Sequence, residues 1–265
     1  MKRLAGLLVA LVFLLPACGT PAGGDVWSDA VIRKAKARGK LRVALEPGFR
    51  PFEYLENGKL VGFDIDLATM IAGELGVELE FIEVAWDGIM ATLDSGKADL
   101  IISGMTATPL RALKVNYSEP YFHTDTITLL RKELASTITA VDQLDRADLK
   151  IAVKLGTTGE HAAKQRMPRA TLIPLANEVD CATEVALGRA DAFVFDRASI
   201  LGHHAKHPDT THVLDLRVSV EPYAIACPKG DVETVAWLNL VLHHLRRDGR
   251  LDALYTKYGL VDAGK

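Results

Sequence analysis

The chain has 265 residues, of which 49% are hydrophobic and 25% are charged, and its formal net charge is −3 at pH 7. This mildly acidic balance excludes the basic footprint of a nucleic-acid-binding protein. Three cysteines are too few for a disulfide framework. For Cys181 and Cys227, a single bond between them is one alternative and two buried thiols are the favoured one.

The N-terminal 17 residues have the pattern of a secretory signal peptide. Two basic residues precede an apolar run over 4–15, which is too short to span a bilayer comfortably. A small residue directly before Cys18 resembles the lipobox of bacterial lipoproteins, so we expect cleavage after residue 17 and lipidation of Cys18. Ordinary signal cleavage, with Cys18 incidental, is the alternative. Residues 18–26, rich in Gly, Pro and Ala, indicate a flexible tether that holds the protein at the periplasmic or extracytoplasmic face of the membrane.

Helix and strand patterns alternate from residue 28 onward. We expect helices over 28–38, over 64–75 with Asp64 as the cap, over 87–96 and from Pro109, and strands over 41–45, 77–84 and 100–102. Glycine follows several of these helices directly, as a helix stop does. Such alternation predicts a mainly parallel α/β lobe.

A second α/β run is expected from residue 149 to about residue 218. Extended stretches over 121–130 and 222–227 flank this run, and we interpret them as crossover hinge strands between two lobes. A helix over 232–247 then returns to the first lobe. The predicted division is lobe 1 over residues 27–123 and 226–265, and lobe 2 with the hinge strands over residues 124–225. Two hinges suit closure around a ligand.

Two pairs of segments repeat a common pattern. Residues 96–104 and 188–196 each contain a glycine stop, an Ala-Asp pair and a short apolar strand that ends in polar residues. Residues 41–48 and 149–156 each contain a strand followed by a glycine. Ligands of α/β sheets gather at the carboxyl ends of strands. The repeats therefore predict two lobes that face one cleft.

Charged residues follow the strand in each half of the repeat. Arg111 lies just past the strand over 100–102, where its guanidinium can hold a carboxylate by two parallel hydrogen bonds and Thr106 can donate a third. Asp196 ends the corresponding strand of the other lobe. Its carboxylate can receive a ligand's ammonium, cap a helix over 197–206, or do both.

The segment over 156–160 places two hydroxyls and free backbone N–H groups at a helix start, which attracts anions. Thr157 and Glu160 also form a capping-box pattern, the preferred interpretation for Glu160. Phe49 and Trp86 follow strands of the first lobe, where flat side chains can sandwich the aliphatic part of a ligand or belong to the core.

Motifs in order along the chain resemble one family. The segments over 51–53, 62–67, 103–106 with Arg111, and 156–158 are similar to the polar amino-acid group of bacterial extracellular solute-binding proteins, family 3, which serve ABC importers. The resemblance covers nearly the whole mature chain. It implies the α/β periplasmic-binding-protein (Venus flytrap) fold, in which two lobes close over an amino acid.

The resemblance also implies roles for individual residues. Arg111, Thr106 and Thr158 would hold the α-carboxylate of the amino acid. Asp196 and the Gly104 carbonyl would hold its α-ammonium. These groups come from both halves of the chain, so a bound zwitterion would bridge the two lobes.

The ligand's side chain is expected to meet four further residues. Phe49 and Trp86 match positions that sandwich it in the family. Glu46 and Lys154 occupy equivalent strand ends in the two lobes and can reach its far end. Because Lys154 would repel a cationic side chain unless Glu46 neutralises it, a glutamine-like ligand is favoured over an arginine-like one.

We therefore expect a monomeric binding protein with no cofactor and no metal, whose partners are a free amino acid, the membrane subunits of an ABC importer and, through its lipid, the membrane. An alternative on the same fold is a periplasmic cyclohexadienyl (prephenate/arogenate) dehydratase, whose catalytic acid resembles Glu160 in position. Thr158-Gly159 departs from the Thr-Asn pair expected before that acid. A third hypothesis is a sensor that presents its ligand to a separate receptor.

Overall fold

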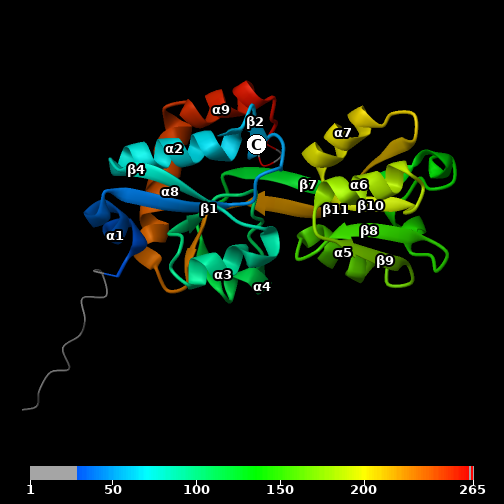
Figure 1. Cartoon of the computed structure of the whole chain (residues 1–265), viewed down its shortest axis with the longest axis horizontal. Coiled ribbons are helices and arrows are strands. Elements are labelled where there is room, and N and C mark those ends of the chain that lie inside the picture. The colour runs from blue at the N-terminus through cyan, green and yellow to red at the C-terminus, as the bar shows by residue number, and fades with distance from the viewer. Residues whose placement is uncertain (1–28, 263, 265) are drawn as a thin grey trace, which may run out of the picture.

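A computed structural model describes residues 29–262 and 264. Two α/β lobes lie side by side and are joined by extended strands (Figure 1), which confirms the predicted fold class. The predicted signal peptide, tether and lipidated Cys18 lie outside the described residues. Within the described part of the chain, every helix is too short or too polar to cross a membrane.

Lobe 1 is built on a five-stranded sheet of order β4-β1-β5-β12-β6. Its strands are β1 (Lys40–Leu45), β4 (Glu78–Glu83), β5 (Leu100–Ile101), β6 (Val115–Tyr117) and β12 (Ala226–Pro228). Strand β1 runs parallel to β4 and β5, whereas β12 runs antiparallel to β5 and β6. A small hairpin of β2 (Tyr54–Glu56) and β3 (Lys59–Val61) is added outside this sheet.

The helices of lobe 1 cover both faces of its sheet. They are α1 (Val31–Arg38), α2 (Phe63–Leu75), the short 3-10 turn η1 (Trp86–Gly88), α3 (Ile89–Asp94), α4 (Pro109–Ala112), α8 (Val232–Arg247) and α9 (Arg250–Tyr258). Helices α2 and α9 lie on one face and α3 on the other (Figure 1). The C-terminal helices α8 and α9 pack against α2.

Lobe 2 is built on a second five-stranded sheet, of order β11-β7-β10-β8-β9. Its elements are β7 (Phe122–Arg131), η2 (Lys132–Leu134), η3 (Val141–Leu144), β8 (Lys150–Lys154), α5 (Thr158–Arg166), β9 (Thr171–Leu175), α6 (Glu178–Ala186), β10 (Ala192–Asp196), α7 (Arg197–Lys206) and β11 (Thr211–Tyr223). Helices α6 and α7 cover one face of the sheet and α5 the other (Figure 1).

Strands β7 and β11 pair antiparallel over most of their length and lead the chain out of lobe 1 and back. The first strand agrees with the stretch expected over 121–130. The second differs, because β11 begins at Thr211 and ends at Tyr223, and the stretch predicted over 222–227 is its end together with β12. The exposed polar residues of β11 and a bulge between Leu214 and Ser219 break the alternation that would have marked it as one strand.

The repeated Ala-Asp motif has the same structural role in both lobes. The Asp99 carboxylate accepts a 2.8 Å hydrogen bond from the N–H of Arg42, and the Asp191 carboxylate accepts one of 2.8 Å from the N–H of Lys150. Each aspartate thereby joins the start of its strand to the parallel neighbour, β1 in lobe 1 and β8 in lobe 2. These matched contacts put the ends of β5 and β10 in equivalent places, facing the space between the lobes.

The predicted cap of α2 is wrong. The helix begins at Phe63 after Gly62, and Asp64 lies within its first turn. The buried Asp64 carboxylate turns inward instead, where it accepts hydrogen bonds from the Gly104 N–H at 2.7 Å and the Tyr121 hydroxyl at 2.8 Å. Gly62 is required because its φ is +136° and a Cβ there would meet the Phe52 carbonyl at 2.1 Å.

The two cysteines of the body are both free and buried. Cys181 lies in α6 of lobe 2, whereas Cys227 lies in β12 of lobe 1. Burial raises the pKa of each thiol to about 12. The favoured prediction of two buried thiols is confirmed, and the alternative of a bond between them is wrong.

Candidate functional site

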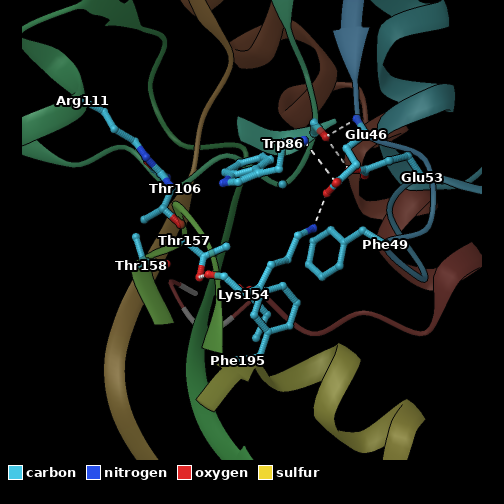
Figure 2. A pocket seen from close by; sticks show the side chains of 13 residues that line it. Glu46, Phe49, Glu53, Trp86, Thr106, Arg111, Lys154, Thr157, Thr158 and Phe195 are labelled. Carbon is cyan, nitrogen blue, oxygen red and sulfur yellow. Dashed lines mark hydrogen bonds and ion pairs between the residues drawn. The ribbon is translucent and has the colours of Figure 1, made fainter. Parts of the chain in front are cut away.

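A cavity of about 360 Å³, its open mouth included, lies between the two lobes. All nine residues predicted to contact a ligand line it, and Figure 2 shows most of their side chains. They are Glu46, Phe49, Trp86, Gly104, Thr106 and Arg111 of lobe 1, and Lys154, Thr158 and Asp196 of lobe 2. The sequence analysis did not select four further lining residues, which are Glu53, Ser103, Thr157 and Phe195.

An ion pair crosses the cavity from one lobe to the other. Lys154, at the end of β8, is only 5% exposed, and its ammonium donates a short hydrogen bond to the Glu46 carboxylate at the end of β1. The other oxygen of the Glu46 carboxylate accepts the backbone N–H of Trp86 at 3.1 Å. Figure 2 shows the Lys154 side chain reaching Glu46 with the rings of Phe49 and Phe195 beside it. This pair neutralises the charges at one end of the cavity.

Aromatic rings form the walls around this pair. The Lys154 ammonium lies 5.8 Å from the Trp86 ring centroid and 5.9 Å from that of Phe195. The Trp86 indole N–H donates to the Gly156 carbonyl at 3.1 Å, which fixes the ring across the cleft. Phe49 stacks on Phe52, whose ring is fully buried and belongs to the core. Phe195 was missed because it follows the strand pattern of a core residue.

Arg111 is placed by the single turn of α4. The Thr108 hydroxyl caps this turn by accepting the Arg111 N–H at 3.2 Å. The guanidinium donates to the Thr106 carbonyl at 3.1 Å and, across the cleft, to the Gly156 carbonyl at 3.0 Å. Burial lowers the pKa of Arg111, while the charges of nearby acids act in the opposite direction. The Arg111 guanidinium remains charged despite its burial. It has five N–H donors, so some are left for a ligand after the two hydrogen bonds to carbonyls.

The hydroxyls of Thr106 and Thr158 converge on one carboxylate oxygen. Glu221, on β11, accepts hydrogen bonds from Thr106 at 2.5 Å and from Thr158 at 2.7 Å. Its other oxygen accepts the Ser219 hydroxyl at 2.5 Å. Sequence reasoning missed Glu221, because no local pattern marks a glutamate of a linking strand as the partner of two distant threonines.

Asp196 is the N-cap residue of α7, which spans the predicted 197–206, but its side chain makes no capping hydrogen bond. Its buried carboxylate accepts a short hydrogen bond from the hydroxyl of Tyr223 on β11. Burial first, and then the negative charge of Glu221, raise the pKa of Asp196 to about 8. A cation placed beside Asp196 would restore its ionised form.

Two buried acids support the loop that follows β5. The Ser103 hydroxyl donates to Glu53 at 2.6 Å, and the Gly104 N–H donates to Asp64. Burial raises the pKa of Asp64 to about 6, and burial together with the charge of Asp64 raises that of Glu53 well above its usual value. Gly104 has φ +51°, and a Cβ there would meet the Phe49 ring at 2.5 Å. The loop is thereby held with little freedom.

Glu160 does not line this cavity but a neighbouring groove between α4 and α5. The Thr157 hydroxyl accepts the Glu160 N–H as a capping box requires. The Glu160 carboxylate, however, accepts the Gly156 N–H at 2.7 Å rather than that of Thr157. Burial by itself raises the pKa of Glu160, but hydrogen bonds from Lys164 and Gly156 outweigh it and hold the pKa below its usual value.

Two lobes joined by two strands, with charged groups of both signs facing one cavity, define a two-lobe binding protein. The chain belongs to the bacterial extracellular solute-binding proteins, family 3, whose pattern it matches over residues 41–261.

Similarity to individual proteins supports this assignment. The L-cystine-binding protein TcyJ of Escherichia coli K12 is 31% identical over 238 residues, which cover 89% of each chain. The crystal structure of the ancestral amino acid-binding protein AncCDT-1, a precursor of cyclohexadienyl dehydratase, is similar to this one. The two sequences are 40% identical, and the TM-score is 0.79 over 86% of this chain and 99% of that one. An ABC transporter binding component from Wolinella succinogenes, solved in complex with lysine, is 38% identical, with a TM-score of 0.80 over 86% and 98%.

Proposed function

We propose that this protein captures a free polar amino acid in the cavity between its lobes and presents it to the membrane subunits of an ABC importer. The proposal rests on the presence of groups of both charges in one cavity. Arg111 and Asp196 line it together with the hydroxyls of Thr106 and Thr158 and the Gly104 loop. This arrangement complements the carboxylate and ammonium of an amino acid.

The contacts with the ligand's backbone are assigned as follows. Arg111, Thr106 and Thr158 hold its carboxylate, and Asp196 and the Gly104 carbonyl hold its ammonium. Thr158 and Asp196 come from lobe 2 and the other groups from lobe 1, so both charges of the ligand contact both lobes. Such contacts stabilise only the closed form, which is how binding drives closure.

The far end of the cavity favours a neutral polar side chain. Lys154 and Glu46 already neutralise each other there, between the rings of Phe49 and Trp86. A cationic side chain would have to displace Lys154 from Glu46 and would be repelled by its ammonium. A carboxamide can instead accept from Lys154 and donate to Glu46. We therefore favour a glutamine-like ligand over an arginine-like one.

We infer that the cleft binds without catalysing a reaction. A dehydratase needs a general acid with a raised pKa inside a dry cleft. Glu160 is the candidate for that role, but its pKa is lowered and its carboxylate is engaged by Lys164 and Gly156 outside the cavity. Prephenate and arogenate are therefore expected to yield no aromatic product.

Delivery to an importer requires the protein to stay near the membrane. We propose that a lipid on Cys18 and the tether over 18–26 hold a monomer at the extracytoplasmic face, where its closed form meets the membrane subunits. The division into lobe 1 (27–123 and 226–265) and lobe 2 (124–225) is part of the same proposal, because the described sheets separate near these boundaries.

Titration calorimetry with purified protein tests the proposed function. We expect one or a few polar amino acids to bind, and Arg111→Ala to lose that binding, because the carboxylate loses its cation. Arg146→Ala is the matched control, since this exposed arginine pairs with Asp148 at the surface of lobe 2. Binding that survives Arg111→Ala would contradict the assigned carboxylate site.

A further inference from the structure

Glu221 is a fully buried acid at the centre of the molecule, between the two lobes. One oxygen of its carboxylate accepts the hydroxyl of Thr106, from the loop after β5 of lobe 1, and the hydroxyl of Thr158, at the start of α5 of lobe 2. Its second oxygen accepts from Ser219, two residues earlier on β11. The side chain thus joins the two lobes through hydrogen bonds that come from the linking strand itself.

The same two threonines are those assigned to the ligand's carboxylate, so the inference rests on the proposed function. A hydroxyl has a single proton and cannot donate it to two carboxylates at once. While Thr106 and Thr158 donate to Glu221, their lone pairs face any incoming carboxylate. A ligand carboxylate can therefore accept these two hydrogen bonds only if Glu221 loses them. The carboxylates of the ligand and of Glu221 would then both lie near Arg111, where their negative charges repel each other.

Asp196, the residue assigned to the ligand's ammonium, has a matching contact from the same strand. Tyr223 lies two residues beyond Glu221, on the same face of β11, and its hydroxyl donates to Asp196. Strand β11 thereby supplies an acceptor to the groups assigned to the ligand's carboxylate and a donor to the group assigned to its ammonium. Without a ligand, the Glu221 carboxylate thus takes the place of the ligand's carboxylate, and the Tyr223 hydroxyl takes the place of its ammonium.

Hydrogen bonds couple this strand to the ligand-facing loop. The Ala107 N–H donates to the Pro222 carbonyl at 2.8 Å, and the Ala224 N–H donates to the Met105 carbonyl at 3.0 Å. Thr106 is consequently held opposite Tyr223. Movement of the lobes about β11 must change the position of Glu221 relative to at least one of its threonines.

We propose that Glu221 is an internal clasp that ties the lobes together through Thr106 and Thr158 and that competes with the ligand's carboxylate for their hydroxyl protons. The clasp has two consequences. It favours a closed molecule before any amino acid binds, and it lowers the affinity by competing with the ligand's carboxylate for Thr106 and Thr158.

Two variants of Glu221 separate these consequences. Glu221→Gln keeps a carbonyl acceptor but removes the negative charge, whereas Glu221→Ala removes the clasp. Asp215→Asn is the matched control, because it removes an exposed charge from the same strand without touching either threonine. Small-angle scattering without added amino acid measures closure, and calorimetry measures binding. If Glu221→Ala does not fold, Thr158→Val removes the lobe 2 half of the clasp in its place.

We expect Glu221→Ala to have a larger radius of gyration than the wild type and Asp215→Asn, and Glu221→Gln to bind the amino acid roughly tenfold more tightly. Unchanged or weaker binding by Glu221→Gln would overturn the competition, and an unchanged radius for Glu221→Ala would overturn the tie between lobes. If the wild type binds no amino acid, the proposed function fails. The scattering result then decides the clasp by itself, a larger radius supporting it and an unchanged radius overturning it.

Discussion

Asp196 is a buried acid in a place that disfavours its charge. Its pKa is raised from the 3.8 of an unperturbed aspartate to about 8, first by burial and then by Glu221. The native state therefore holds the proton more tightly than the unfolded chain. The resulting contribution to the free energy of unfolding is fully present below pH 3.8 and is lost as the pH rises to about 8.

Comparing the wild type with Asp196→Asn tests this linkage. Between pH 6 and pH 8 the wild type should lose about 2 kcal/mol of unfolding free energy that the variant does not lose, as measured by urea denaturation without ligand. Asp64 and Glu53 titrate in both proteins, so the difference isolates Asp196. Parallel pH profiles for the two proteins would mean that Asp196 is ionised in the native state across this range.

Lys154 is the residue that we expect to decide between neutral and cationic ligands. Lys154→Met removes the ammonium but keeps the aliphatic stem, so Glu46 is left free to pair with the side chain of arginine or lysine. Affinity for these amino acids should rise roughly tenfold or more relative to glutamine, as measured by calorimetry. Lys150→Met, on the exposed start of the same strand, should leave the order of ligands unchanged. An unchanged order in Lys154→Met would exclude Lys154 from specificity.

At the scale of single elements, helix α5 depends on close contact with β10. A Cβ at Gly159 would meet the Val194 carbonyl at 2.6 Å, whereas a Cβ at Gly202 of α7 would meet no heavy atom within 4 Å. Gly159→Ala should therefore push α5 away from the sheet, lowering stability by about 1–3 kcal/mol and displacing Thr158. Gly202→Ala should be neutral or stabilising by up to about 1 kcal/mol.

Thermal and urea unfolding of both glycine variants would measure this contrast. Both positions are helical, so the intrinsic preference of alanine for helix is the same in the two variants and only the packing differs. Equal changes in the two variants would show that α5 can shift without cost, and the positioning of Thr158 by this contact would then be wrong.

Elements with strong local signals were predictable. Helix α8 begins after an aspartate whose side chain accepts the N–H of Thr234, and its bounds agree with the predicted 232–247. Helix α2 ends at Leu75, and Gly76 follows it in the left-handed conformation, as a glycine stop requires. Its start was misplaced because an aspartate near a helix N-terminus has the appearance of a cap, whereas Asp64 is directed to partners in other elements.

Contacts between distant segments were not predictable in the same way. Glu221 meets Thr158 and Thr106 from 63 and 115 residues away, so only the folded topology brings the three together. The same holds for the pairing of Lys154 with Glu46, for which the sequence indicated equivalent strand ends but not the contact. The sequence thus indicated which residues line the cavity better than how they bond to one another.

At the scale of the whole molecule, the proposed lipid anchor has a direct test. Cys18→Ala removes the thiol that would carry the lipid, so the protein should move from the membrane fraction to the soluble fraction on cell fractionation. Cys181→Ala is the matched control, because its thiol is buried within α6 of lobe 2. Membrane association that persists in Cys18→Ala would contradict lipid anchoring.

Thermal unfolding of residues 19–265 in the presence of each common amino acid, of prephenate and of arogenate tests whether the protein captures an amino acid between its lobes. A ligand at about a thousand times its dissociation constant should add roughly 4 kcal/mol to the stability of the folded state. We predict a large shift with one or a few polar amino acids, lost in Arg111→Ala and Asp196→Ala. No shift with any amino acid, or a shift with prephenate or arogenate alone, would contradict the capture of an amino acid between the lobes.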